Sequence, residues 1–157
     1  MAKGFFIFMV VYLFRASLVE QQVRIVHVDE IQSLINNQSD TTYIINFFAS
    51  WCKPCLKEIP EFNHFADANK DAKLKVVFVS LDVKKNYELV LLPLLKKYNI
   101  RQTIYLLDEP DADKWINQID SNWSGSIPAT LIVNNIKHSK KFIAEPLTYD
   151  ELNKLTK

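Results

Sequence analysis

The sequence predicts an α/β fold, with helices on both faces of a central mixed β-sheet. Segments typical of strands alternate with segments typical of helices along most of the chain. The last two strand-like segments form a plausible hairpin, which adds an antiparallel pair to the sheet. Residues 43–49 ("YIINFFA") form a continuous apolar run rich in β-branched and aromatic residues, which is typical of a strand buried on both faces.

Each expected element has a local signal. Strands are expected at residues 24–28, 43–49, 73–82, 103–108 and 129–133, with a hairpin partner at 137–145. Helices are expected at residues 30–37, 53–69, 87–99, 111–119 and 148–155. Asp29 is the predicted cap of the first helix, and Thr148 with Glu151 has the capping-box spacing of the last. Pro60 and Pro93 lie inside two helices, and Pro60 is expected to kink its helix.

The composition excludes several classes of protein. The chain has 157 residues, which suits one domain with a real core. Its 19 basic and 18 acidic residues give a net charge of +1, so charge provides no reason to expect nucleic acid as a partner. Only two glycines occur, Gly4 and Gly125, which excludes glycine-rich phosphate loops and dinucleotide fingerprints.

The N-terminus carries an apolar segment of its own. Residues 4–14 ("GFFIFMVVYLF") are uncharged and follow Lys3. A helix of this length spans about 16 Å, roughly half of a bilayer's hydrocarbon core, which suits the apolar region of a secretory signal. We expect residues 1–18 to be a signal peptide or short membrane anchor, followed by a domain at 22–157. A buried N-terminal strand is the alternative.

Both cysteines of the chain, Cys52 and Cys55, follow the buried strand at 43–49 and open the next helix. A sulfur at a helix N-terminus faces unpaired amides and the positive end of the dipole. Such sites lower a cysteine pKa to about 3.5–7.5 and favour the thiolate. Cys55 lies one turn inside the helix and is expected to be shielded. The pattern therefore separates an attacking sulfur from a resolving one.

A structural zinc site and a structural disulfide are the alternatives to a redox pair of cysteines. A structural zinc site needs four ligands, and the three histidines of the chain do not stand in ligand spacing. A structural disulfide with a two-residue gap closes a very small loop and restricts the unfolded chain little. The strand–turn–helix context favours a redox pair over both.

The acidic run at residues 108–113 lacks the glycine and distal glutamate of a calcium loop and indicates a helix N-terminus instead.

The motifs "NFFASWCKPC" and "SIPATLIV" resemble the thioredoxin superfamily over about residues 22–157, and "LKEIP" makes the chain most similar to oxidoreductases of the TlpA/ResA type. The resemblance implies a thioredoxin-like fold with Cys52 as nucleophile and Cys55 as resolving thiol. It further implies that Pro128 is a cis-proline facing the cysteines and that the backbone of Ile127 pairs with an extended substrate segment. Trp51 is expected to contact that segment.

Two further positions refine this resemblance. Asn46 stands where thioredoxins proper have a buried aspartate, and Glu58 follows the second cysteine by three residues, as in the TlpA/ResA group. Glu58 is one turn beyond Cys55 on the same helical face, where its carboxylate could move a proton to or from that thiol. A partly buried site would raise its pKa. A solvated surface glutamate is the alternative, and for Trp123 substrate contact and packing are equally open.

The expected function is that of a thiol–disulfide oxidoreductase, more specifically a reductase of protein disulfides in the cell envelope. Its redox-active group would be the Cys52–Cys55 disulfide, with no other cofactor and no metal. The expected partners are a protein disulfide or dithiol substrate and a membrane-linked thiol electron donor, and the expected location is periplasmic or otherwise extracytoplasmic. The alternatives are a thiol peroxidase on the same fold, for which Ser50-Trp51 supplies no peroxide-binding threonine, and a binding or chaperone module with a vestigial CxxC.

Overall fold

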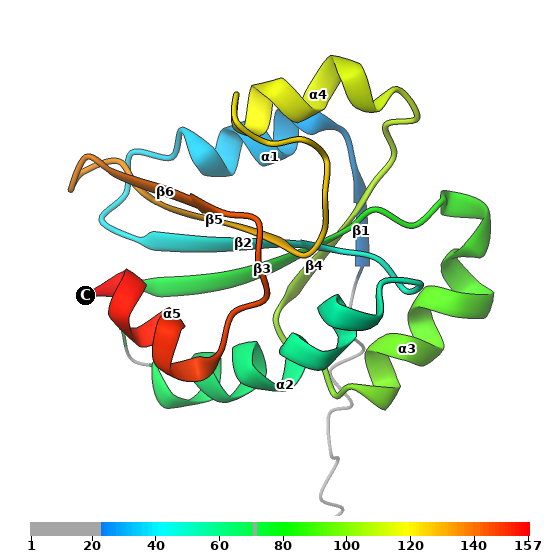
Figure 1. The fold of residues 1–157 in the computed structure, drawn as a ribbon, viewed down its shortest axis with the longest axis horizontal. Helices are drawn as coiled ribbons and strands as arrows, with labels where there is room; N and C mark the ends of the chain where they lie inside the picture. The colour runs from blue at the N-terminus through cyan, green and yellow to red at the C-terminus, as the bar shows by residue number, and fades with distance from the viewer. Residues whose placement is uncertain (1–22, 71) are drawn as a thin grey trace, which may run out of the picture.

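The computed structural model of the chain describes residues 23–70 and 72–157. Six strands form one mixed sheet in the order β1-β4-β3-β2-β5-β6 (Figure 1). The strands are β1 (Val23–Val26), β2 (Thr42–Phe48), β3 (Leu74–Ser80), β4 (Thr103–Leu107), β5 (Ala129–Asn134) and β6 (Ser139–Ile143). The first four in this spatial order run parallel, whereas β5 is antiparallel to both β2 and β6. The predicted mixed sheet and its terminal hairpin are confirmed.

Helices cover both faces of the sheet, as predicted. The helices α1 (Val28–Ile35) and α4 (Ala112–Ile119) lie on one face, above the sheet in Figure 1. The opposite face carries α2 (Lys53–Ala68), α3 (Leu92–Lys97) and α5 (Tyr149–Thr156). Each layer of helices encloses its own hydrophobic core, because the side chains of a strand alternate between the two faces.

The two cores are built around aromatic side chains of neighbouring positions in β2. Phe48 points towards α2 and packs against Phe78, with ring centroids 5.8 Å apart. Phe47 points to the other face and packs against Trp123 at 4.7 Å. Full burial of such side chains contributes about 1.5–3 kcal/mol each. The strand that leads to Cys52 is therefore anchored on both sides.

The cap of the first helix differs from the prediction. Asp29 lies inside the first turn of α1, and His27 occupies the cap position. The carboxylate of Glu30 accepts a hydrogen bond from the His27 backbone N–H at 3.0 Å, and the helix begins two residues earlier than predicted. At the other end of the chain the predicted capping box is confirmed: Thr148 N–H donates to Glu151 and Glu151 N–H donates to the Thr148 hydroxyl.

The helix predicted at residues 87–99 is not one regular helix. A 3₁₀ turn at Lys84–Asn86 leads into a π-helical turn, η2 (Tyr87–Leu91), and regular α-helix begins only at Leu92. Pro93 explains the break, because it has no N–H to donate back along the helix and fits only near a helix start. In contrast, α2 runs without interruption through Pro60, and the kink expected there stays a prediction.

The expected signal peptide or anchor at residues 1–18 lies outside the described residues. Among residues 23–70 and 72–157, no helix combines the length and apolar character needed to cross a membrane.

Candidate active site

Cys52 and Cys55 are joined by a disulfide at the start of α2, with their Cα atoms 5.3 Å apart. Cys52 is the N-cap of the helix, and its sulfur accepts a hydrogen bond from the Cys55 backbone N–H at 3.3 Å. Cys55 is completely buried, whereas Cys52 retains slight exposure. The predicted placement is confirmed: the first sulfur sits among helix N-terminal amides and the second lies behind it.

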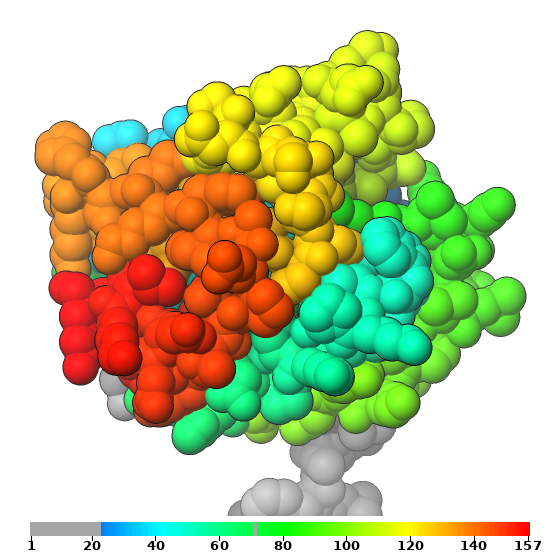
Figure 2. Space-filling view, viewed as in Figure 1, coloured from blue at the N-terminus to red at the C-terminus, as the bar shows by residue number. Residues whose placement is uncertain are grey.

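The loop before β5 brings a second backbone segment to the carboxyl end of β2, close to where the cysteine segment begins. The peptide bond between Ile127 and Pro128 is cis, as the sequence resemblance implied. The antiparallel register pairs Ala129 with Phe47, the next-to-last residue of β2. Pro128, the residue before Ala129, therefore lies beside the carboxyl end of β2, where the cysteine segment begins. Pro128 is buried and Ile127 is half-buried. The start of α2 and the loop before β5 lie on the same face of the molecule (Figure 2).

Glu58 is buried one turn beyond Cys55, with only 3% of its surface exposed. Its two carboxylate oxygens accept one hydrogen bond each, from the side-chain amide of Asn46 at 2.8 Å and from the backbone N–H of Leu147 at 2.8 Å. Burial raises the pKa of the Glu58 carboxyl to about 7, although both hydrogen bonds act in the opposite direction. The solvated alternative is therefore wrong, and the predicted raised pKa is confirmed.

Asn46 connects the Glu58 site to the sheet. Its amide nitrogen donates both to Glu58 and to the hydroxyl of Thr130 in β5, at 2.8 and 3.1 Å. Its own carbonyl oxygen Oδ1 is buried and has no hydrogen-bond partner in the part of the chain that the structure describes. The sequence pointed to both Asn46 and Glu58, but their contact follows from the packing of α2 onto β2.

Asp82 forms a second buried carboxylate site, which the sequence analysis missed. It lies just past β3 and accepts hydrogen bonds from the Ser50 backbone N–H at 3.0 and 3.2 Å, from the Ser50 hydroxyl at 2.6 Å and from the Ser80 hydroxyl at 2.8 Å. Because Ser50 lies two residues before Cys52, this cluster fixes the path of the chain into the disulfide. The available signal was the placement of Asp82 at the carboxyl end of a strand next to β2.

Comparisons with known proteins agree with this geometry. A family model described as thioredoxin matches residues 22–138. The chain belongs to the thioredoxin family. A curated relative, sporulation thiol-disulfide oxidoreductase A of Bacillus subtilis, is 29% identical over 122 residues, which cover 78% of this chain and 70% of the relative. With its CxxC disulfide, this thioredoxin-family protein is a thiol–disulfide oxidoreductase, and the similarity supports the TlpA/ResA-like branch.

Two solved structures share the fold of this thioredoxin-family enzyme. The crystal structure of StoA from Bacillus subtilis is 25% identical with a TM-score of 0.58, and the match covers 77% of this chain and 86% of that one. A thioredoxin-related protein from Neisseria meningitidis serogroup B is 21% identical with a TM-score of 0.65, covering 76% and 84% of the two chains. These likenesses confirm the predicted thioredoxin-like fold.

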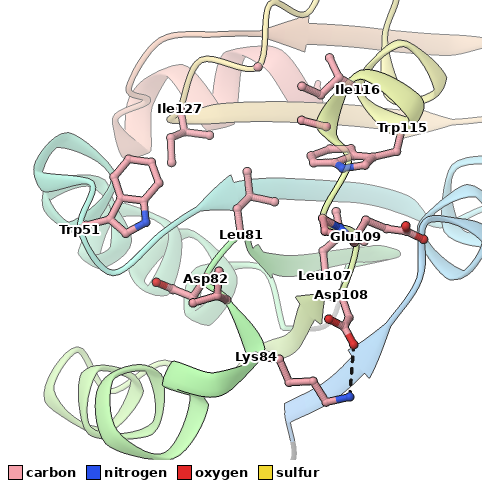
Figure 3. Close-up of a pocket in the computed structure, with 14 residues that line it drawn as sticks. Trp51, Leu81, Asp82, Lys84, Leu107, Asp108, Glu109, Trp115, Ile116 and Ile127 are labelled. Carbon is pink, nitrogen blue, oxygen red and sulfur yellow. Dashed lines mark hydrogen bonds and ion pairs between the residues drawn. The ribbon is translucent and has the colours of Figure 1, made fainter.

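A groove of about 370 Å³ begins at Trp51, the residue directly before Cys52 in this thioredoxin-family enzyme (Figure 3). Trp51 and Ile127 stand at one end of it, so the structure brings together two of the residues predicted to contact substrate. The side chain of Trp51 is 70% exposed. The rest of the lining comes from the segments after β3 and β4, from α4 and from the loop before β5: Leu81, Asp82, Val83, Lys84, Leu107, Asp108, Glu109, Pro110, Ala112, Trp115, Ile116 and Gly125.

Trp123 has a packing role. It is buried, its ring packs against Phe47 and Trp115, and its indole N–H donates to the Ser126 carbonyl at 2.8 Å. This hydrogen bond helps to shape the loop that carries Ile127.

Within residues 23–70 and 72–157 no group of three or more acidic, histidine or cysteine side chains is arranged to hold a metal ion.

Proposed function

We propose that this oxidoreductase reduces protein disulfides in the cell envelope, with Cys52 as the attacking sulfur and Cys55 as the resolving sulfur. The observation that carries the proposal is the arrangement of three groups along α2. A sulfur with slight exposure caps the helix, a buried sulfur lies behind it, and a buried carboxylate with a pKa of about 7 follows one turn later.

In the first step the Cys52 thiolate attacks one sulfur of a substrate disulfide. A disulfide forms between Cys52 and the substrate, the substrate's own S–S bond breaks, and the departing thiolate takes a proton from water. The helix N-terminus favours the attacking thiolate, because its amide N–H groups and dipole stabilise negative charge. The substrate segment would extend along the backbone of Ile127 beside Pro128, with Trp51 as an apolar contact.

In the second step Cys55 resolves the mixed disulfide. The Cys55 thiol gives its proton to the Glu58 carboxylate and its sulfur attacks that of Cys52, which releases the second substrate thiolate. Side chains three residues apart on a helix lie about 5–6 Å apart at Cβ, so Glu58 is close enough to act directly or through one water. Two electrons pass to the substrate, and the enzyme is left with the Cys52–Cys55 disulfide.

A further dithiol must then reduce the enzyme. We assign this role to a membrane-linked thiol donor, because the apolar run at residues 4–14 would deliver or tether the chain outside the cytoplasm. The absence of further cysteines fits such a location, where additional thiols would be oxidised and mispaired.

Two matched variants test the proposal. Reduced wild-type protein is expected to reduce insulin disulfides. Cys52→Ser lowers the rate to that of the buffer reductant, because the attacking thiolate is lost. Cys55→Ser keeps Cys52 and is expected to accumulate mixed disulfides with envelope proteins, detectable as reductant-sensitive adducts by mass spectrometry. Equal insulin reduction by wild type and Cys52→Ser, or fast peroxide turnover without disulfide reduction, would contradict the proposal.

A further inference from the structure

We propose that the groove that begins at Trp51, the residue before Cys52, binds an extended substrate segment with an apolar side chain next to its cysteine and a basic side chain several residues away. The inference rests on the proposed function and adds to it the chemical class of the substrate. The groove has an apolar end at Trp51 and Ile127 and an acidic end at the carboxyl terminus of β4, and a substrate segment can contact both (Figure 3).

The apolar end is formed by side chains from the two segments that carry Cys52 and the cis-proline. Trp51 precedes Cys52 in the chain and is mostly exposed, and Val83 on the neighbouring wall is exposed as well. Ile127 faces the groove from the loop before β5 (Figure 3). Large apolar side chains exposed together at the rim of a cleft mark an interaction surface. A substrate residue adjacent to the attacked cysteine can therefore bury an apolar side chain here.

The acidic end is formed where β4 leads into α4. Three carboxylates line the groove, those of Asp82, Asp108 and Glu109, against a single lysine, Lys84. Asp82 does not contribute to binding, since both of its oxygens already accept hydrogen bonds from Ser50 and Ser80. The charge available to a substrate is therefore that of Asp108 and Glu109, partly offset by Lys84.

Among the described residues, neither Glu109 Oε2 nor Asp108 Oδ1 has a hydrogen-bond or ion-pair partner, so each carboxylate keeps an oxygen for a ligand. Glu109 is 27% exposed, and its contacts with the His27 imidazole at 3.2 Å and with the Val28 N–H at 3.4 Å use Oε1 alone. Asp108 pairs with Lys84 through Oδ2 at 3.2 Å, and the two side chains are 35% and 58% exposed. Such an exposed ion pair is weak and can yield to or share with an incoming cation. An arginine or lysine of the substrate thus meets two available carboxylate oxygens.

The size of the groove agrees with a short segment. Its volume is at the lower end of the range of about 300–1,000 Å³ for ligand clefts, and an extended chain advances about 3.3 Å per residue. Positive charge on the substrate would both guide association and fix the direction in which the segment lies.

A pair of peptides tests the proposal. Each has nine residues with a central cysteine carried as a mixed disulfide with thionitrobenzoate and with leucine beside it. One peptide has two lysines and the other two glutamates, three to four residues from the cysteine. Attack by Cys52 on the peptide sulfur releases the coloured thiolate. At low salt the kcat/KM of the reduced enzyme for the lysine peptide should exceed that for the glutamate peptide about tenfold.

Salt dependence and charge-removing variants show whether the preference for the lysine peptide comes from Asp108 and Glu109. The Debye length shrinks from about 10 Å at 0.1 M to about 3 Å at 1 M salt, so the preference should fall to about twofold at 1 M. Asp108→Asn with Glu109→Gln should reduce the kcat/KM ratio of the two peptides to about two already at low salt. The matched control, Glu145→Gln with Asp150→Asn, removes the same charge from exposed residues outside the groove and should keep the ratio.

A binding measurement separates this inference from the redox function. In Cys52→Ser/Cys55→Ser, calorimetry with the same peptides carrying serine for cysteine should show tighter binding of the lysine peptide. If wild type reduces both peptides equally and calorimetry finds no preference, the groove proposal is overturned and the redox function stands. If neither peptide reacts but calorimetry retains the preference, the redox function fails instead. Binding of a second copy of this chain in the groove would also overturn the groove proposal. It would appear as a molecular mass that rises with protein concentration in wild type but not in the variant Asp108→Asn with Glu109→Gln.

Discussion

Glu58 in α2 and Asp82 after β3 are both almost fully buried near the cysteine segment, yet their surroundings differ. Asp82 accepts hydrogen bonds on both oxygens from backbone and hydroxyl donors of Ser50 and Ser80. Glu58 has one donor for each oxygen, and the carbonyl oxygen of the neighbouring Asn46 amide is buried without a partner among residues 23–70 and 72–157. Burial outweighs these two bonds and raises the Glu58 pKa to about 7.

The difference teaches how one active site uses buried carboxylates for two tasks. A carboxylate surrounded by donors holds its neighbours in place, because each donor would be left unpaired without it. A carboxylate with few donors in an apolar site exchanges its proton near neutral pH and can serve the thiol next to it. Asp82 is therefore expected to position the chain, and Glu58 to transfer protons. Variants of the two residues should therefore differ in the property they change, stability for Asp82 and proton transfer for Glu58, as well as in the size of the effect.

The largest effect is expected for Glu58→Gln in catalysis. Removing the proton acceptor should slow resolution of the mixed disulfide by about 10²-fold and abolish the rise in rate as pH passes through about 7. Stopped-flow measurement of single-turnover disulfide reduction from pH 5.5 to 8.5 checks this. Glu61→Gln is the matched control, since Glu61 also lies on α2 and accepts a backbone N–H, that of Tyr149 at 3.0 Å. An unchanged pH profile in Glu58→Gln would remove the distinction between the two carboxylates.

Stability should depend on pH through the same residue. The pKa of Glu58 in the folded protein, about 7, lies above its ordinary value of 4.5, so the folded state holds the proton more tightly. The contribution of Glu58 to the free energy of unfolding is complete below pH 4.5 and is lost as pH rises through 7, a change of about 3 kcal/mol. Urea unfolding of the oxidised protein at pH 5 and pH 8 measures it. The free energy of unfolding of wild type minus that of Glu58→Gln should become smaller or change sign at pH 8. The same difference at both pH values would contradict the raised pKa of Glu58.

Asp82→Ala should instead act on stability and loop geometry. It leaves the Ser50 N–H and the Ser80 hydroxyl without their acceptor, which costs about 2–3 kcal/mol. Asp82→Asn keeps one acceptor oxygen and should lose about half as much. In both variants the inflection of the rate near pH 7 should remain, because Glu58 is untouched. Thermal unfolding and the stopped-flow profile measure the two properties, and loss of the inflection would assign proton transfer to Asp82 as well.

Asn46→Asp should move the Glu58 titration upwards. A second carboxylate replaces the amide donor at 2.8 Å, so the pair resists double ionisation and its upper apparent pKa should rise by about one unit or more above 7. The pH profile of resolution records the shift. Thr130→Val removes the other contact of Asn46 without adding charge and should leave the upper pKa within about half a unit, since its effect is indirect. An equal shift in both variants would contradict the electrostatic explanation.

The smallest effect is expected at the start of α5. The hydroxyl of Thr148 caps this helix directly after Leu147, whose N–H donates to Glu58. Thr148→Ala should cost about 1 kcal/mol of stability and raise the Glu58 pKa slightly by loosening that donor. Urea unfolding and the pH profile provide the measurements. Thr148→Ser retains the hydroxyl and should match wild type in both.

The sequence was sufficient for features that depend on local pattern or short spacing. The alternation of segments predicted the layers, and the spacing of Cys52 and Cys55 at the helix start predicted that Cys55 is the more shielded sulfur. The Ile127–Pro128 cis bond came from the resemblance, and the burial of Glu58 was left open by the sequence. The Ser50–Asp82 contact could not be predicted, because it joins residues 32 apart through the register of β2 and β3. The acidic run at 108–113 was read as a helix start, and its place on the groove follows from the position of β4 in the sheet.

The three tryptophans of the chain occupy two kinds of environment, and this gives the protein an optical signal of its own. Trp115 and Trp123 are both buried, but Trp115 also lines the groove, so the emission of Trp123 is the component that should stay constant as long as the fold does. Trp51 faces solvent next to Cys52, where a disulfide quenches indole fluorescence and a bound segment changes its polarity. Emission at long wavelength therefore follows the oxidation state and occupancy of the site, while the short-wavelength component serves as an internal reference.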